Sequence, residues 1–150
     1  MFPSAAPGPE QSSATSQPMI LGFDPGRQKC GLAIMGLDRK IYYHQVVTAA
    51  EVLTTIQRLR EQFPISLLVM GDQTTAPAWR KRLQDLPQPL RIILVDERYS
   101  TLEARDRYWQ MYPPRGLYRL IPLGMRTAPR LLDDIVAIVL IERYLERLVE

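Results

Sequence analysis

The hydrophobic period of the sequence changes once, near residue 49, and this change constrains the fold more than any other feature. Before it, strand-like runs are joined by short turns, which is typical of antiparallel pairing. After it, segments with helical spacing alternate with continuous apolar runs, which is typical of parallel pairing. We therefore expect an α/β fold with a mixed five-stranded sheet, three antiparallel strands followed by two parallel ones, and helices on both faces. The expected strands are 19–24, 31–37, 41–48, 65–71 and 90–97.

Four segments are expected to be helices. Ser100 and Glu103 have the spacing of a capping box, which predicts that a helix begins at Ser100. The last segment contains the run IVAIVLI, which is apolar on all sides of a helix and must be deeply buried. The expected helices are 49–63, 77–86, 100–112 and 130–150.

The chain has 150 residues, of which 46% are hydrophobic, and this is enough for one domain with a real core. We expect that domain to span 19–150. Residues 1–18 are rich in Pro, Ser, Ala and Gln, which predicts a disordered tail. The tail lacks the features of a secretion signal, and no apolar run is long enough to span a membrane, so we expect a cytoplasmic protein without membrane association.

The composition also excludes several kinds of site. Cys30 is the only cysteine, which excludes a disulfide framework and a cysteine-rich zinc site and suits a reducing cytosol. His44 is the only histidine, and its place in a strand-like run favours a packing role over a catalytic one. The formal net charge of +3 permits an anionic partner such as nucleic acid but does not demand one.

Carboxylates stand where the expected strands end. Asp24 ends the first strand, Asp72 the fourth and Glu97 the fifth, while Asp133 and Asp134 open the last apolar helix. Parallel neighbours place like ends together, and sites in open α/β sheets form at the carboxyl ends of strands. We therefore expect the three strand-end acids to converge.

Converging carboxylates repel one another unless they share protons or bind hard divalent cations. Because His and Cys ligands are lacking, Mg²⁺ or Mn²⁺ is the favoured ion, and two such ions would clamp a phosphodiester and activate a water. Each strand-end acid alone could also be an ordinary turn residue. Asp133 alone could be explained as a negative charge that is favourable at a helix N-terminus.

Positive charge gathers on the expected loop between 112 and 130, which contains no acid. A loop of this length is uncommon in a compact domain and is often functional. We expect its arginines, together with the one beside Glu97, to hold a phosphate backbone, although solvated charges would give the same pattern. The expected nucleic-acid-binding residues are Arg98, Arg115, Arg119, Arg126 and Arg130.

Three stretches, LGFDPGRQKCGLAI, VDERYSTLEAR and LLDDIVAIVLIERYL, resemble the YqgF family in order and spacing. These bacterial proteins are linked to pre-16S rRNA processing and were earlier described as Holliday-junction resolvases. The resemblance implies a ribonuclease H-like fold and a nuclease that uses two Mg²⁺ or Mn²⁺ ions. It places the three family acids on Asp24, Glu97 and Asp133. Asp134 would replace Asp133 if the register shifts by one, and Asp72 would supplement or replace Glu97, as in the related RuvC-like resolvases.

The substrate and the activity stay open at this point. The segment GDQTTAPAW replaces the Gly-Leu-Pro type segment of the family and indicates a divergent branch. We expect a nuclease that acts on structured nucleic acid, on RNA rather than branched DNA. The alternatives are a non-catalytic nucleic-acid-binding module and an ATP-binding protein, because DPGRQKCGLAI also looks like the first phosphate loop of the actin and sugar-kinase superfamily. The oligomeric state is open, and a homodimer is compatible with the chain.

Overall fold

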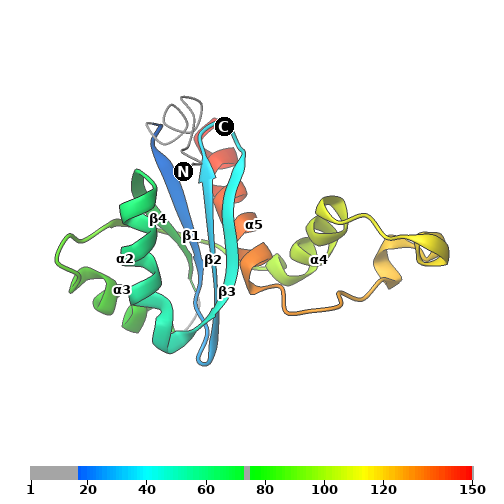
Figure 1. Ribbon diagram of the computed structural model, residues 1–150, viewed down its shortest axis with the longest axis horizontal. Coiled ribbons are helices and arrows are strands. Elements are labelled where there is room, and N and C mark those ends of the chain that lie inside the picture. Colours follow the sequence, from blue (N-terminus) through cyan, green and yellow to red (C-terminus); the bar gives the residue numbers. More distant parts are fainter. Residues whose placement is uncertain (1–16, 73–74, 150) are drawn as a thin grey trace, which may run out of the picture.

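The computed structural model describes residues 17–72 and 75–149, which build a five-stranded sheet with helices on both faces (Figure 1). Most of the expected tail, residues 1–16, lies outside the described residues. The strand order is β3-β2-β1-β4-β5. The first three strands pair in antiparallel fashion, and β4 runs parallel to both β1 and β5, so the expected mixed sheet is confirmed. The strands are β1 (Met19–Asp24), β2 (Lys29–Gly36), β3 (Ile41–Thr48), β4 (Ile65–Gly71) and β5 (Arg91–Val95).

Helices cover both faces of the sheet, and each face forms its own hydrophobic core with the helices on it. Along β1, the side chains of Leu21 and Phe23 pack in the core formed with α2 and α3, whereas Ile20 packs in the core formed with α5. This division follows from the period of two in a strand. Helix α4 packs against α5 outside the sheet. The helices are α2 (Val52–Gln62), α3 (Ala76–Gln84), α4 (Ser100–Met111) and α5 (Asp133–Val149), with short 3₁₀ helices η1 (Ala49–Glu51), η2 (Gly116–Leu120) and η3 (Leu123–Met125).

Helix α5 lies directly on the sheet. Every residue of its apolar run, 135–141, is buried, as the sequence predicts. Two glycines make the close approach possible. A Cβ atom at Gly22 would lie 2.5 Å from the carbonyl oxygen of Ala137, and one at Gly31 would lie 1.8 Å from that of Asp133. The first turn of α5 is thereby fixed over β2, beside the carboxyl end of β1.

The start of α4 corrects one expectation. The helix does begin at Ser100, but the capping box is wrong, because no side chain caps the helix and Tyr99 takes the N-cap position with a left-handed φ of 63°. The Ser100 amide donates to the carbonyl of Glu97 instead. Glu103 is drawn into an ion pair with Arg143 of α5, so a contact between helices replaces the local cap.

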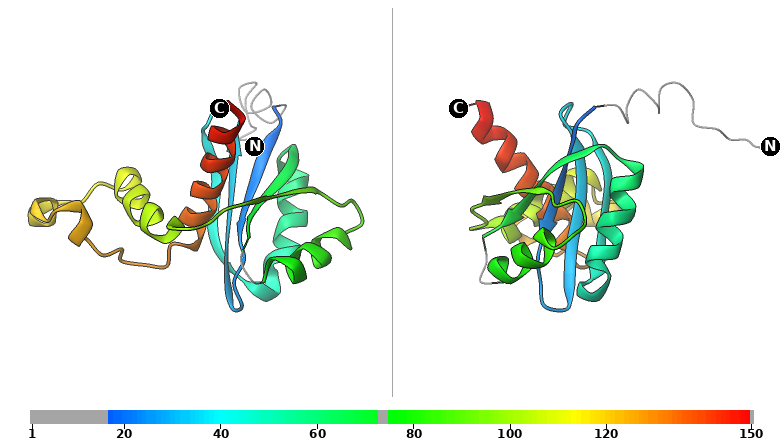
Figure 2. Two further views of the ribbon diagram at one scale, coloured as in Figure 1. Left: turned by 180° about the vertical axis from the view of Figure 1, so that it is seen from behind. Right: turned by 90° about the vertical axis from the view of Figure 1, so that its left-hand side faces the viewer.

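A segment of residues 112–130, called the arm below, extends away from the sheet between α4 and α5 (Figures 1 and 2). The sequence predicts an irregular loop here, and the arm contains only η2 and η3. It is nevertheless ordered by its own contacts. The Tyr118 hydroxyl bonds to the backbone of Thr127, and the Arg126 guanidinium donates to the carbonyl of Ile121.

The described residues form no helix that is long and apolar enough to cross a membrane.

The contact between α5 and β2 yields a stability prediction. We expect Gly31→Ala to destabilise the fold by about 3 kcal/mol or more, because backbone atoms of Asp133 occupy the space that the methyl group needs. Gly124→Ala is the matched control, since nothing lies within 4 Å of a Cβ atom there. Urea unfolding of both variants measures the difference, and equal midpoints would contradict the tight contact.

Candidate active site

The acids at the carboxyl edge of the sheet come from three neighbouring parallel strands. Asp24 ends β1, Asp72 follows β4, and Glu97 follows β5, which stops at Val95 rather than at residue 97. A Cβ atom at Gly71, the last residue of β4, would lie 2.8 Å from a carboxylate oxygen of Glu97. The side chain of Glu97 therefore lies across the end of β4.

The first turn of α5 adds a fourth acid to this edge. The side chains of Asp24 and Asp133 are hydrogen-bonded to each other. A cavity of about 290 Å³ opens beside them, and Ser100 and Thr101 of α4 also line it. Strand β1, helix α4 and helix α5 thus surround one polar opening.

The electrostatics of the acids are unfavourable to ionisation. Burial, followed by the charges of Asp133 and Glu97, raises the pKa of Asp24 to about 8. Burial, followed by the charges of Asp72 and Asp96, raises the pKa of Glu97 to about 7. Burial also raises the pKa of Asp133, although the hydrogen bond that Asp24 donates to it acts in the opposite direction. Neighbouring carboxylates with raised pKa values are typical of functional sites.

These acids fit a hard divalent cation by their donor chemistry. Among residues 17–72 and 75–149, no group of three or more His, Cys, Asp and Glu side chains is arranged to hold a metal ion. The close pair Asp24 and Asp133 nevertheless offers carboxylate oxygens in a buried place, next to the charge of Glu97. A cation at the same place would neutralise the charges of both carboxylates.

Asp72 stands at the margin of the acid group. Its charge acts on Glu97, but its side chain is exposed and lines a different cavity of about 300 Å³, together with Arg80 and Lys81 of α3. Residues 73–74, which follow it, lie outside the described part of the chain. The structure therefore brings Asp72 near Glu97 without joining it to the pair of Asp24 and Asp133.

The two aspartates that open α5 have different partners. Asp133 contacts Asp24, whereas Asp134 is 2% exposed and bonds to His44 and Arg130 on the side of β3. Burial alone would raise the pKa of Asp134, but the hydrogen bonds from Arg130 and His44 lower it. Asp134 is thus held as an ion by its own partners, and the geometry brings Asp133 to the acid group.

His44 has a role that the sequence analysis missed. Its Nδ1 lies 2.7 Å from Oδ2 of Asp134, and its Nε2 lies 3.2 Å from the Tyr112 hydroxyl. The spacing of Arg130 and Asp134, four residues apart, could have indicated their ion pair. No signal in the sequence indicates His44, because it lies 90 residues from its partner.

The expected phosphate-binding arginines fall into two groups. Arg98 forms an ion pair with Asp96, and Arg126 and Arg130 are tied to carbonyl or carboxylate groups of the protein. Arg115 and Arg119 are exposed on the arm, and their side chains form no ion pair with any of the described residues. Of the five expected arginines, these two are the ones whose guanidinium groups are not engaged by a group of the described residues.

Comparisons with known proteins agree with this geometry. No protein-family model matches the chain. A Xylella fastidiosa protein (strain 9a5c) named "Putative pre-16S rRNA nuclease" is 30% identical, covering 91% of this chain and 93% of its own length. A protein of the same name from Xanthomonas axonopodis pv. citri is 28% identical with the same coverage.

Two solved structures share the fold. The Fowlpox virus resolvase, in a complex with Holliday junction DNA, superposes with a TM-score of 0.61 at 14% identity, covering 88% of this chain and 99% of that chain. RuvC of Thermus thermophilus, in a complex with a Holliday junction substrate, superposes with a TM-score of 0.51 at 16% identity, covering 83% of this chain and 90% of that chain. The expected ribonuclease H-like fold is thereby confirmed.

The raised pKa of Asp24 yields a prediction about pH. Without divalent ions, we expect stability to fall as pH rises from about 4 to about 8, because the folded state then holds a proton that the unfolded state has released. Asp24→Asn removes the loss of stability that comes from ionising Asp24. At pH 8 it should be more stable than the wild type by at least about 1.4 kcal/mol, the value of one pKa unit.

Urea unfolding in EDTA at several pH values measures this difference, which should shrink toward pH 4. Glu61→Gln, an exposed acid of α2, is the control and should leave the pH profile unchanged. An Asp24→Asn profile that runs parallel to the wild type would contradict the raised pKa.

Proposed function

The chain belongs to the YqgF family, whose relatives bear the name of pre-16S rRNA nucleases, and we propose on this basis that it is a metal-dependent nuclease. It would hydrolyse phosphodiester bonds in structured nucleic acid, with the ends of pre-16S rRNA as the preferred substrate. The observation that carries the proposal is the hydrogen-bonded pair of Asp24 and Asp133, with Glu97 beside it, at the carboxyl edge of a ribonuclease H-like sheet.

In this proposal Asp24, Glu97 and Asp133 are the catalytic acids and the ligands of Mg²⁺ or Mn²⁺. Two such ions, when bound, supply charge neutralisation and an activated water for in-line attack. The charges of both Asp133 and Glu97 act on Asp24, so Asp24 would be the acid that helps to hold either ion. Asp72 adjoins Glu97 and would supplement it, whereas Asp134 would not serve as a ligand, because Arg130 and His44 already hold it.

The arm would hold the nucleic acid. Arg115 and Arg119 offer guanidinium groups to phosphates. Leu117 lies between them and is 82% exposed. Leu120 and Met125 follow them and are 74% and 73% exposed. Exposed apolar side chains beside arginines suit a strand whose bases are unstacked, as at the frayed ends and loops of structured RNA. The arm ends at Arg130, three residues before Asp133, so a strand bound along it would be led toward the acids.

A single domain over 19–150 and a cytoplasmic location belong to the same proposal, since ribosomal RNA is processed in the cytoplasm of bacteria. The homodimer that the chain allows stays a prediction, which the molecular mass in solution tests directly.

The central test is cleavage of a panel containing pre-16S rRNA ends, single-stranded RNA, duplex DNA and a four-way junction, with Mg²⁺, Mn²⁺ or EDTA. We expect metal-dependent cleavage of the rRNA ends, and a loss of at least about 100-fold in Asp24→Asn and Asp133→Asn, because each removes a ligand charge. Asp38→Asn changes an exposed acid in the β2–β3 turn and should cleave normally.

Full activity in Asp24→Asn would contradict the assigned site. If the wild type binds RNA in a salt-sensitive manner but cleaves nothing with either ion, the non-catalytic binding module replaces the nuclease as the function.

The role of the arm predicts a change in salt dependence. In an Asp24→Asn background, the double change Arg115→Ala and Arg119→Ala should weaken RNA binding and lower the slope of log K against log salt by about 1.4, the value for two contacts to single-stranded phosphates. Lys40→Ala with Arg91→Ala is a control of equal charge, because both residues are exposed and lie at the edge of the sheet opposite the acids, in the β2–β3 turn and at the start of β5. Equal slopes for the two double variants would contradict the assignment.

A further inference from the structure

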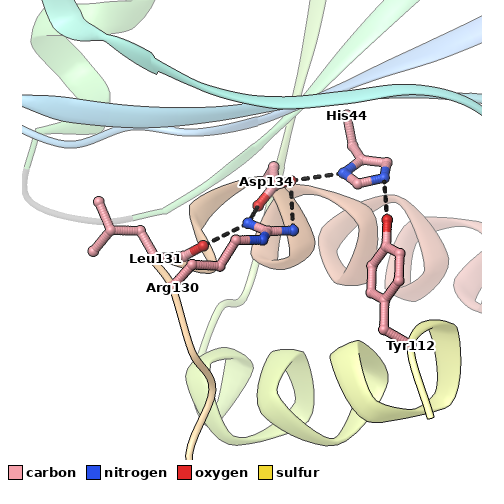
Figure 3. Close-up of polar contacts among 5 residues, drawn as sticks. All are labelled: His44, Tyr112, Arg130, Leu131 and Asp134. Atoms are coloured by element: carbon pink, nitrogen blue, oxygen red, sulfur yellow. Dashed lines mark hydrogen bonds and ion pairs between the residues drawn. The ribbon is translucent and has the colours of Figure 1, made fainter. Parts of the chain in front are cut away.

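Both ends of the arm are linked to one buried carboxylate, one directly and the other through His44 (Figure 3). Arg130, its last residue, donates from Nη1 to Oδ1 of Asp134 over 2.9 Å and from Nη2 to Oδ2 over 3.3 Å. The hydroxyl of Tyr112, the first residue of the arm, lies 3.2 Å from Nε2 of His44. Nδ1 of the same histidine lies 2.7 Å from Oδ2 of Asp134. These four residues are called the arm clamp below.

The proton positions in the arm clamp follow from its chemistry. The Asp134 carboxylate accepts two hydrogen bonds from the Arg130 guanidinium, so in its contact with the same carboxylate Nδ1 of His44 is the donor. In a neutral ring, Nε2 then accepts a hydrogen bond from the Tyr112 hydroxyl. Oδ1 of the buried carboxylate accepts from Arg130 at the end of the arm, and Oδ2 accepts from both Arg130 and His44 of β3. A buried ion that loses one partner is strongly penalised, so the arm clamp has one favoured arrangement.

The arm clamp borders open space. A cavity of about 480 Å³ lies beside it, lined by Gln45 and Val46 of β3 and by Leu131, together with His44, Arg130 and Asp134. Packing therefore does not enclose the base of the arm on this side. The polar contacts hold it there together with Tyr108 of α4, whose ring lies 5.2 Å from the ring of Tyr112 and 5.4 Å from the guanidinium carbon of Arg130.

The arm clamp also reaches the candidate active site through the backbone. Asp134 follows Asp133 directly, and the carbonyl of Asp133 rests on Gly31 of β2. The same turn of α5 thus carries one side chain toward Asp24 and the next toward His44. Whatever fixes Asp134 to the arm also fixes the arm relative to Asp133.

We propose that Asp134 is a positioning residue, which uses His44 and Arg130 to hold the arm in register with the acid pair of Asp24 and Asp133. A strand held by the arm is then presented to the acids at a constant position. The part of the inference that concerns cleavage rests on the proposed nuclease function, whereas the anchoring of the arm does not.

The anchoring is tested by limited trypsin digestion of the full chain, followed by mass spectrometry of the cuts after Arg115 and Arg119. Asp134→Asn keeps the size of the side chain but removes its charge, and we expect these cuts to become at least about 10-fold faster. Glu142→Gln is the matched control, since it breaks another Arg–carboxylate pair between α4 and α5, with Arg107, away from the arm clamp. It should leave the cuts in the arm unchanged.

The positioning role is tested with an RNA that carries a pre-16S rRNA end. In Asp134→Asn we expect the cleavage rate at saturating RNA to fall at least about 10-fold, while the Kd for RNA changes less than about 3-fold, because the arm still binds but no longer holds the strand in place. His44→Ala should act in the same way and serves as the second variant if Asp134→Asn does not fold.

The outcomes separate the two claims. Equal digestion of the arm in Asp134→Asn and Glu142→Gln overturns the anchoring. Faster digestion with an unchanged cleavage rate overturns the positioning role. Faster digestion in a protein whose wild type cleaves no RNA supports the anchoring and overturns the proposed nuclease function instead.

Discussion

The close approach of α5 to the sheet is the contact on which the other features depend. At Gly22 and Gly31 the helix backbone occupies space that any side chain would need. This contact brings the first turn of α5 beside the end of β1, and only there can Asp133 meet Asp24. It also explains why the middle of α5 is apolar on all sides, because its other faces pack against β-strand side chains and α4. The core and the acid group thus share one cause.

That arrangement carries an electrostatic cost. Folding brings several carboxylates together in a buried place, where the pKa of Asp24 rises to about 8. A chain selected for stability alone would put neutral side chains there, since a buried charge without compensation is costly. The compensation must come from protons or from cations supplied by the solution. The acid group is therefore best understood as a place whose charge is completed by something that the chain does not itself contain.

Much of this follows from local sequence, and the rest requires contacts over long distances. The strands, the order of pairing and the buried helix follow from hydrophobic period, and the edge shared by Asp24 and Glu97 follows from parallel pairing. The capping box failed because Arg143, forty residues away, attracts Glu103 from the local cap. The partnership of His44 with Asp134 has no local signal at all. Such pairs become visible only when the fold has brought β3 and α5 together.

The neighbouring aspartates show how one helix turn can divide two tasks. Successive residues of an α-helix point about 100° apart, so two adjacent side chains at a helix start cannot face the same partner. Here one faces the end of β1 and the other faces β3. The difference in partners then separates their chemistry: Asp134 is neutralised by donors of the protein, and Asp133 meets another acid. Two consecutive acids cannot be told apart from the sequence, and in the structure Asp133 contacts Asp24 whereas Asp134 contacts His44.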